Sequence, residues 1–316
     1  RKSYAELEPK DITCIDPCMG SGHILVYMFD VLMDIYRSEG FSERDAAFSI
    51  LENNIHGLDI DKRAYQLSYF ALMMKARSYN RTFFRGKANE EGDRYFIEPM
   101  VFAIEESNGI NIGQLKYFGA NLSEIEKNNA INQMQGLLDS LRDAKEYGSI
   151  LTIDNYDWDM LLEFVASEST DGQISFDTLG IEATQCQMKK LIYQGRIMSN
   201  KYCVVSTNPP YMGANGMGNK LSGYCKSNYP NSKTDLYSVF IEKCKRMTKE
   251  NFYQSMITQQ SWMFLGSFTK LRKSVLENLI VNMAHLGARA FDEISGEVVQ
   301  TSAFVLRKTC DVDEYR

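Results

Sequence analysis

The chain has 316 residues, of which 44% are hydrophobic, and a formal net charge of −6. This length and apolar content predict one large α/β domain or two smaller ones. The acidic balance excludes the strongly basic footprint of a self-sufficient nucleic-acid-binding domain. No stretch approaches the roughly 18 to 20 apolar residues that cross a bilayer, and the polar start lacks the apolar core of a signal peptide. We therefore expect a cytoplasmic protein.

The cysteines and histidines give no metal or disulfide pattern. Seven cysteines are scattered along the chain without a CxxC pair, which argues against both a disulfide framework and a zinc ribbon. We expect them to be reduced and mostly buried. The three histidines, His23, His56 and His285, are widely separated in sequence, so we predict no metal site.

Residues 1–84 alternate short apolar strands with helices. The predicted elements are a strand at 12–17, a helix at 24–37, a helical stretch at 43–53, a strand at 55–61 and a helix at 62–79. Strands alternating with helices predict a parallel, doubly wound sheet. We interpret this segment as the first part of an α/β core.

The alternation loosens in the middle of the chain and then resumes. Residues 85–200 are predicted to form a mostly helical insertion that carries one core strand near 149–153. From 201 to 316 we predict strands at 202–207, 254–259, 282–287 and 301–308, helices at 235–248 and 267–279, and a long polar loop at 212–234. The last two strands suggest an antiparallel hairpin at the sheet edge.

The segment from Asp16 to His23, DPCMGSGH, lies between a predicted strand and a helix. Ligands of open α/β sheets bind beyond the carboxyl ends of the strands, where glycines allow the backbone to come close. No lysine follows Gly22, so a phosphate-binding loop is disfavoured. Asp16 instead suits a ligand with an ammonium or another cationic centre. A tight turn without any ligand is the alternative.

Asp59 ends the next predicted strand, in the string GLDID. A carboxylate at this place can accept both hydroxyl groups of a ribose. Together, Asp16 and Asp59 indicate an adenosine-type cofactor without phosphates. Asp59 could alternatively cap the helix that starts at Lys62, although Asp61 is better placed for that role.

The string TNPPYMG, residues 207–213, follows the predicted strand at 202–207. Consecutive prolines end the strand, and their fixed φ angles hold the neighbouring groups rigidly. Asn208 then presents an amide, Pro209 a carbonyl without a competing donor, and Tyr211 a flat ring. A simple Asn-Pro-Pro turn is the alternative.

DPCMGSGH, GLDID and NPPY, in that order, resemble the motifs of the γ-ordered adenine-N6 DNA methyltransferases, which use S-adenosylmethionine. The strings at 232–244, 259–272 and 285–308 extend the resemblance, more narrowly, to the methyltransferases of BREX phage-defence systems. The resemblance covers about residues 12–308 and is weakest in the insertion. It implies a class I methyltransferase fold with a mostly parallel seven-stranded sheet.

The resemblance also implies a site. The catalytic residues would be Asn208, Pro209, Pro210 and Tyr211, acting on an adenine flipped out of double-stranded DNA, with neither a metal nor a covalent nucleophile. The implied cofactor-binding residues are Asp16, Pro17, Cys18, Gly20, Ser21, Gly22, Asp59, Ile60, Ser149 and Asn208. The turn at 16–22 would surround the methionine end, Asp59 would bind the ribose and Ile60 would pack on the adenine ring. Ser149 would replace the acid that the family carries after its third strand.

The chain opens at Arg1, almost on its first motif, so we expect a piece of a longer protein. Family members carry a C-terminal target-recognition domain, which we expect to be absent here, and this piece alone would bind DNA weakly. Lys233 and Asp235 are predicted to order the loop after Tyr211. Two other functions remain open: methylation of protein glutamine or RNA guanine, and a cofactor-binding scaffold in a defence complex with other proteins.

Overall fold

The computed structural model describes residues 6–89, 92–167, 180–287 and 300–309. The described chain forms two compact units. The first contains the residues up to Ala103 and those from Lys201 onward, and the second runs from Ile104 to Asn200.

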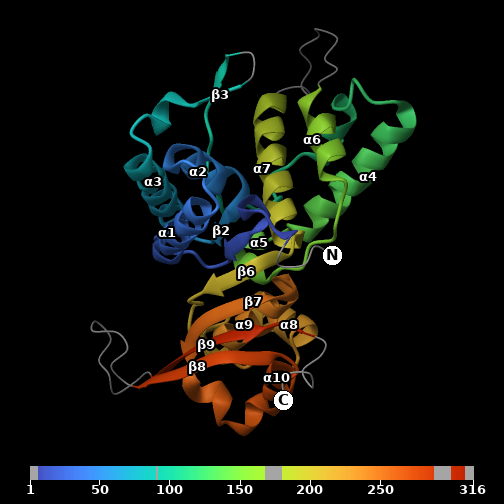
Figure 1. Ribbon diagram of the computed structural model, residues 1–316. Coiled ribbons are helices and arrows are strands. Elements are labelled where there is room, and N and C mark those ends of the chain that lie inside the picture. The colour runs from blue at the N-terminus through green and yellow to red at the C-terminus, as the bar shows by residue number, and fades with distance from the viewer. Residues whose placement is uncertain (1–5, 90–91, 168–179, 288–299, 310–316) are drawn as a thin grey trace. The chain divides into compact units, whose positions relative to one another are not determined.

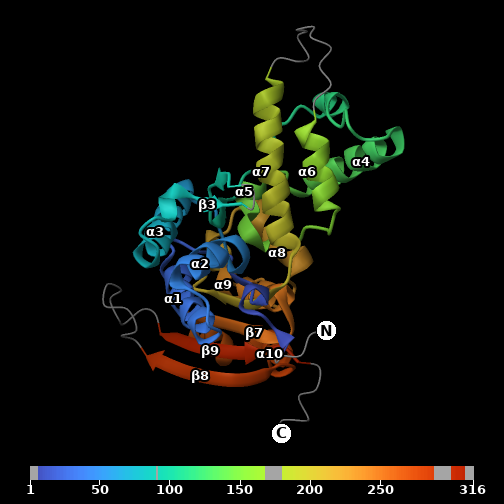
Figure 2. The same ribbon diagram turned by 45° about the horizontal axis from the view of Figure 1, so that its top comes forward.

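A seven-stranded sheet forms the centre of the first unit, in the order β5-β2-β1-β6-β7-β9-β8 (Figure 1). Its strands are β1 (Cys14–Asp16), β2 (Ile55–Asp59), β5 (Met100–Ala103), β6 (Tyr202–Thr207), β7 (Thr248–Gln259), β8 (Leu279–Gly287) and β9 (Thr301–Arg307). The first five strands in this order, from β5 through β2, β1 and β6 to β7, pair in parallel. In contrast, β9 is antiparallel to both β7 and β8. Figures 1 and 2 both show β7, β9 and β8 side by side.

Helices follow the parallel strands in this unit. They are α1 (His23–Ser38), α2 (Glu43–Ser49), α3 (Lys62–Tyr79), α8 (Asn219–Asn228), α9 (Leu236–Met247) and α10 (Thr269–Leu276). The chain moves outward from β1 toward β5 through α1 and α3, and outward from β6 in the opposite direction through α9. Right-handed crossovers therefore put these two groups of helices on opposite faces of the sheet. A small hairpin, β3 (Lys87–Ala88) with β4 (Arg94–Tyr95), precedes β5.

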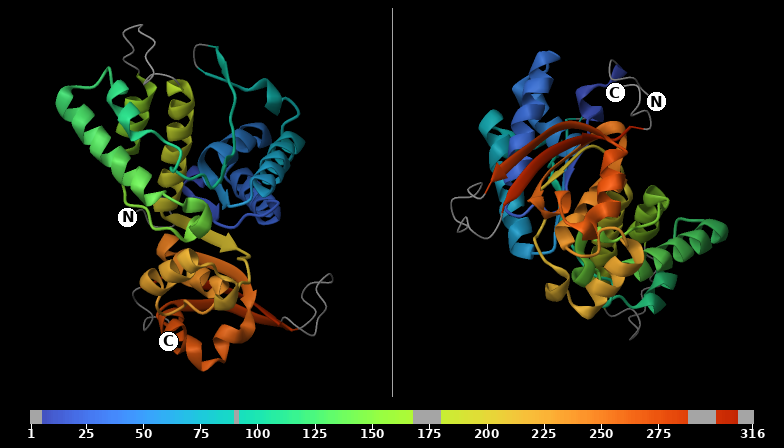
Figure 3. Two further views of the ribbon diagram at one scale, coloured as in Figure 1. Left: turned by 180° about the vertical axis from the view of Figure 1, so that it is seen from behind. Right: turned by 90° about the horizontal axis from the view of Figure 1, so that it is seen from below.

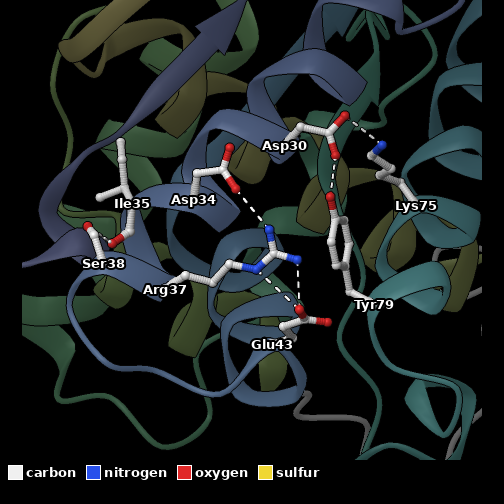
Figure 4. A network of polar contacts seen from close by, with 8 residues as sticks. All are labelled: Asp30, Asp34, Ile35, Arg37, Ser38, Glu43, Lys75 and Tyr79. Carbon is white, nitrogen blue, oxygen red and sulfur yellow. Dashed lines mark hydrogen bonds and ion pairs between the residues drawn. The ribbon is translucent and has the colours of Figure 1, made fainter.

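Polar contacts tie α1 to its neighbours outside the apolar core (Figure 4). Asp30 accepts a hydrogen bond from Tyr79 Oη at 2.6 Å and pairs with Lys75 Nζ at 2.6 Å, and both partners lie on α3. Arg37 pairs with Glu43 of α2 at 2.7 Å. Beneath this network the core is apolar, with Phe29, Leu32 and Met33 fully or almost fully buried. The three helices therefore form one packed layer against β1 and β2.

The second unit is helical. It contains α4 (Glu124–Ser140), α5 (Ala144–Tyr147), α6 (Trp158–Ala166) and α7 (Ile181–Ser199), with α4, α6 and α7 packed together (Figure 3, left). Its core buries Met134, Leu137, Leu161, Phe164 and Leu191. The buried amide of Gln194 accepts from the Glu105 N–H at 2.8 Å and donates to the Glu105 carbonyl at 3.1 Å. This pair of bonds fixes the start of the unit to α7.

Most predicted elements are confirmed, and two predictions are wrong. The strand predicted near 149–153 does not form, because residues 148–150 make a 3-10 turn and β5 at 100–103 takes the place beside β2. The predicted loop at 212–234 contains α8, whose Leu221 and Cys225 are buried. The edge hairpin of β8 and β9 is confirmed.

Four of the six described cysteines are buried, and all six are free thiols. Cys310 lies outside the described residues. None of the described helices combines the length and the apolar character that a membrane span requires.

Candidate functional site

Asp16 ends β1 and is almost fully buried. Its Oδ1 accepts a hydrogen bond from Thr207 Oγ1 at 2.6 Å and another from the Cys18 N–H at 2.9 Å. Burial raises the pKa of Asp16 to about 7, and the nearby charge of Asp59 adds to the rise, while both hydrogen bonds act in the opposite direction. Asp16 is thus poised between its neutral and its charged form near neutral pH, and its Oδ2 takes part in neither bond.

Asp59 ends β2, the neighbouring strand. Its Oδ2 accepts from the Gly20 N–H at 2.8 Å, and its Oδ1 accepts from the Asp61 N–H at 2.8 Å. Asp61 caps α3 by accepting from the Arg63 N–H at 2.7 Å. Asp59 is therefore free of the capping role. Each of its carboxylate oxygens keeps a second lone pair for a ligand hydroxyl.

The two glycines of the turn are needed for different reasons. Gly22 has φ +87°, and a Cβ there would lie 2.3 Å from Ser68 Oγ, so close packing of the turn on α3 requires glycine. Gly20 has φ +52°, but a Cβ there would meet no atom within 4 Å. The space beside Gly20 is open, as the approach of a ligand to this turn would require. The Ser68 hydroxyl is buried and has no hydrogen-bond partner in the described structure.

The residues of this edge fit the cofactor of the predicted family. Asp59 offers lone pairs for a ribose, the Gly20 turn is open, and Ile60 next to Asp59 exposes 50% of its surface although it is apolar. An exposed isoleucine at a strand tip is suited to cover an adenine ring. Pro17 is buried, Cys18 is half-buried and Ser21 is exposed, with Ser21 Oγ 2.9 Å from His23 Nδ1.

The NPPY corner follows β6 directly. Asn208 and Pro210 are exposed, Pro209 is buried and Tyr211 is half-buried. The Tyr211 phenol donates to Asn208 Oδ1 at 3.3 Å, and burial raises its pKa to about 12. The Tyr211 ring meets the Tyr237 ring edge to face, with 6.0 Å between centroids. The amide and the ring of the corner are therefore held next to each other.

Asp235 fixes the segment after Tyr211. Its Oδ1 accepts from the Met212 N–H and from the Tyr237 N–H, both at 3.2 Å, so one oxygen joins the corner to the first turn of α9. The Leu236 N–H donates to the Met212 carbonyl at 2.9 Å. The predicted ordering by Asp235 is thus present in the structure. Lys233 lies in the adjoining turn, and its predicted role stays a prediction.

Sequence reasoning missed Thr207 and Tyr237. Thr207 bonds to Asp16, and Tyr237 packs against Tyr211 and holds Ser261 Oγ at 2.6 Å. Thr207 belongs to the string TNPPYMG and Tyr237 to the string at 232–244, but their partners are distant in sequence. Only a three-dimensional pairing of β1 with β6 reveals the first contact.

The prediction of Ser149 as a cofactor residue rests on a strand near 149–153, and that strand does not form. Ser149 is instead buried in the 148–150 turn of the second unit. The strand beside β2 is β5, and Glu105 follows its last residue, Ala103, by two positions. The string PMVFAIEE, residues 99–106, has the pattern of an apolar strand followed by an acid, and this pattern could have indicated β5. Glu105 pairs with Lys145 at 3.0 Å in the second unit.

The strand order, the antiparallel pair at one end and the acids that end β1 and β2 define a class I methyltransferase fold. Two DNA-bound Type ISP restriction-modification enzymes have similar folds. LlaGI, as a nuclease-deletion mutant, gives a TM-score of 0.53 and LlaBIII one of 0.51, each at 15% identity over 98% of this chain and over 21% and 17% of theirs. At this identity the likeness supports the fold alone.

The chain belongs to the Eco57I restriction-modification methylase family, whose model matches residues 53–291. S-adenosylmethionine is the methyl donor of such methyltransferases. The string at 285–308 that contributed to the predicted resemblance lies partly outside the described residues.

Two curated relatives align along nearly the whole chain. It is 42% identical over 98% of its length to the adenine-specific methyltransferase PglX of Lacticaseibacillus casei (strain Zhang). It is 36% identical over 96% of its length to the adenine-specific methyltransferase BrxX of Escherichia coli O9:H4 (strain HS). The chain spans about a quarter of the length of these relatives, 24% and 26%.

Proposed function

We propose that this chain is the methyl-transferring part of a site-specific adenine-N6 DNA methyltransferase in a restriction-modification or BREX-type phage-defence system. One observation carries the proposal: the Thr207–Asp16 hydrogen bond joins the turn at residues 16–22, called the cofactor turn, to the residue before NPPY. The ends of β1, β2 and β6 then present Asp16, Asp59 and Asn208 at one edge of the sheet. The similarity to PglX and BrxX supports adenine in DNA as the acceptor.

The corner suits an amine that is a poor nucleophile. The lone pair of the exocyclic adenine nitrogen is delocalised into the ring, so the enzyme must hold the nitrogen in a more tetrahedral geometry. Asn208 Oδ1 and the Pro209 carbonyl would accept the two amine hydrogens, and Oδ1 can do so while it still accepts from Tyr211, because an amide oxygen has two lone pairs. Positioning and charge placement would supply most of the rate enhancement.

The cofactor would contribute an electrophilic methyl group on a sulfonium. Asp16, Pro17, Cys18 and the turn of Gly20, Ser21 and Gly22 would hold its methionine end, where ionised Asp16 would balance the ammonium charge. Asp59 would bind the ribose hydroxyls and Ile60 would cover the adenine ring.

The target adenine would leave the duplex, because its amine cannot be methylated inside the base stack. Tyr211 would stack on the flipped base, a contact that contributes roughly 1 to 3 kcal/mol per base. Pro210 keeps the ring in place through its fixed φ angle. We place the reaction in the cytoplasm, on double-stranded DNA, in company with other defence proteins.

The test compares the full-length gene product with its Asn208→Ala variant. Single-molecule sequencing of host DNA, with and without the gene, reports the modified base and its sequence context together. We expect N6-methyladenine at one recurring sequence with the wild type, and none with Asn208→Ala, while calorimetry shows that the variant still binds S-adenosylmethionine, more weakly than the wild type because Asn208 is itself an implied cofactor contact.

Other outcomes would contradict the proposal. Methylation of ribosomal RNA or of a glutamine side chain, with unmodified DNA, would make the acceptor wrong. Cofactor binding without any methylated product would favour a scaffold in a defence complex.

A further inference from the structure

Two large apolar side chains are exposed immediately beyond β7. Phe264 exposes 66% of its surface and Leu265 exposes 53%. They form the corner between the 3-10 turn at 260–263 and the short turn at 266–268, and are called the apolar corner below. Their neighbours Trp262 and Phe268 are buried, so the corner is the part of this segment that points away from the core.

The apolar corner lies at the same edge of the sheet as NPPY, where the parallel strands end. β7 pairs in parallel with β6, with Thr207 opposite Met256, so the loops after both strands leave the sheet on the same side. Tyr237 links them, since its ring contacts Tyr211 and Phe268 and its phenol lies 2.6 Å from Ser261 Oγ. Tyr237 is therefore the side chain that connects NPPY to the segment that carries the apolar corner.

The backbone of the corner is held rigidly. Arg272 Nη1 donates to the Trp262 carbonyl at 2.8 Å and to the Leu265 carbonyl at 2.6 Å. Thr269 Oγ1 donates to the Gly266 carbonyl at 2.7 Å. A guanidinium bonded to carbonyls on either side of Phe264 leaves this turn little freedom, so the two side chains are presented in a fixed place rather than at the end of a loose loop.

The segment around the corner is basic in an otherwise acidic chain. Lys270 in the first turn of α10 and Lys273 in its last turn are both exposed, and no acidic residue occurs between Glu250 and Glu277. An apolar projection beside exposed lysines matches a partner that combines stacked apolar rings with phosphates. DNA has this chemistry, and proteins that kink or open DNA insert phenylalanine and leucine side chains between base steps.

We propose that Phe264 and Leu265 enter the DNA base stack beside the flipped adenine and occupy the space that it leaves, while Lys270 and Lys273 bind the neighbouring phosphates. This inference rests on the proposed function, because only an enzyme that extrudes a base creates such a gap. The corner keeps the adenine outside the stack long enough for Asn208 to receive it.

The test measures single-turnover methyl transfer by the full-length gene product on two duplexes that carry its mapped site. One duplex is ordinary. In the other, a pyrene nucleotide replaces the thymine opposite the target adenine, so that the pyrene fills the vacated space and pushes the adenine out. We expect Phe264→Ala/Leu265→Ala to lower the rate about 10- to 100-fold on the ordinary duplex, and to act within about threefold of the wild type on the pyrene duplex.

Phe70→Ala is the matched control. Phe70 lies on α3 and exposes 63% of its surface, close to the exposure of Phe264, so its loss should leave both rates unchanged. Lys270→Gln/Lys273→Gln should reduce the slope of log affinity against log salt by about 2, without rescue by pyrene. The inference would be overturned if the apolar-corner variant lost the same factor in methyl-transfer rate on both duplexes, or if it lost no rate on the ordinary duplex.

The same rate measurements distinguish a failure of the proposed function from a failure of this inference. Asn208→Ala should abolish transfer on both duplexes. If the wild type methylates no adenine in DNA, or if Asn208→Ala retains its activity, the proposed function falls and this inference falls with it. If Asn208→Ala is inactive and the apolar-corner variant is unaffected, only the inference is wrong.

Discussion

Thr207 donates a hydrogen bond to Asp16 at 2.6 Å, although 191 residues separate the two in sequence. The bond joins the last residue of β6 to the last residue of β1, and both side chains are buried. Because the Asp16 carboxylate loses water on folding, the Thr207 hydroxyl supplies one of the donors that stabilise its charged form. Thr207 therefore influences the charge of the cofactor turn without belonging to it.

Thr207→Val should weaken S-adenosylmethionine binding at pH 7 by about tenfold. Valine keeps the shape of threonine but donates no hydrogen bond, and a bond to a charged acceptor contributes roughly 1.5 to 3 kcal/mol. Isothermal titration calorimetry measures the loss, with Thr207→Ser as the control that keeps the hydroxyl. Equal affinity for the valine and serine variants would contradict this role.

Cofactor affinity should depend on pH through Asp16. Its pKa of about 7 in the free protein means that the carboxyl is neutral below pH 7, whereas a cationic cofactor favours the charged form. Affinity should therefore rise by about tenfold per pH unit up to pH 7 and then level off. Titrations between pH 5.5 and 8 test this, and Asp16→Asn should remove the slope.

The raised pKa of Asp16 makes the stability of the cofactor-free protein fall with rising pH, whereas the affinity for the cofactor rises. Because the pKa of Asp16 is raised on folding, the folded state binds the proton more tightly than the unfolded chain. The contribution of Asp16 to stability is therefore present in full below about pH 4 and is lost as the pH rises to about 7. Denaturant midpoints of the cofactor-free protein and of Asp16→Asn report this difference.

Asp59→Ala and Asp61→Ala should separate ligand binding from helix capping. Both remove a carboxylate that accepts backbone N–H groups, but only Asp59 is left with lone pairs facing the proposed ribose. We expect Asp59→Ala to weaken cofactor binding by about 100-fold or more. Asp61→Ala should cost about 1 kcal/mol of stability with unchanged affinity. Equal losses of affinity would make the ribose assignment wrong.

Gly22→Ala should destabilise the protein more than Gly40→Ala. Both glycines have φ above +80°, so alanine strains either backbone by about 1 to 2 kcal/mol. At Gly40 a Cβ meets nothing, whereas at Gly22 it lies 2.3 Å from Ser68 Oγ and the turn must move away from α3. Urea denaturation gives both free energies, and equal values would show that the contact with Ser68 relaxes without cost.

Asp235→Ala should lower kcat about tenfold and leave the affinity for the cofactor unchanged. The variant loses the acceptor that holds the Met212 N–H, so the NPPY corner is positioned less well, and it also loses the cap of α9. Asp235→Asn keeps the accepting oxygen and should restore kcat. A rise in KM at unchanged kcat would point instead to a role in DNA binding.

Strands and helices were predictable where local patterns were strong. The helix predicted at 62–79 is observed with those bounds, and β6 begins and ends where the apolar run does. Asp59 ends β2, and Asn208 and Tyr211 follow β6, so the proposed site could also be located from the sequence. Its three motifs are short loops after strands, and the parallel pairing of β1 with β2 and β6 brings them to one edge.

The wrong predictions concern segments whose structure depends on contacts with distant parts of the chain more than on the local sequence pattern. Residues 149–153 and 100–103 are both short apolar runs, and only pairing with β2 selects the second as a strand. The polar run at 219–228 gave no helical signal because only Leu221 and Cys225 of α8 are buried. Partners far apart in sequence, such as Thr207 and Asp16, leave no local pattern.

The helical unit from Ile104 to Asn200 is inserted between β5 and β6, which delays completion of the sheet during synthesis. A ribosome that adds 5 to 20 residues per second needs about 10 to 40 s to travel from β1 to β6. During that interval one side of β1 has no partner strand, and its backbone groups remain open to other chains. The inserted unit, with its own core, can fold in the meantime. We therefore expect ribosome-bound chains that end before Tyr202 to bind chaperones more strongly than chains long enough for both β6 and β7 to have left the ribosome.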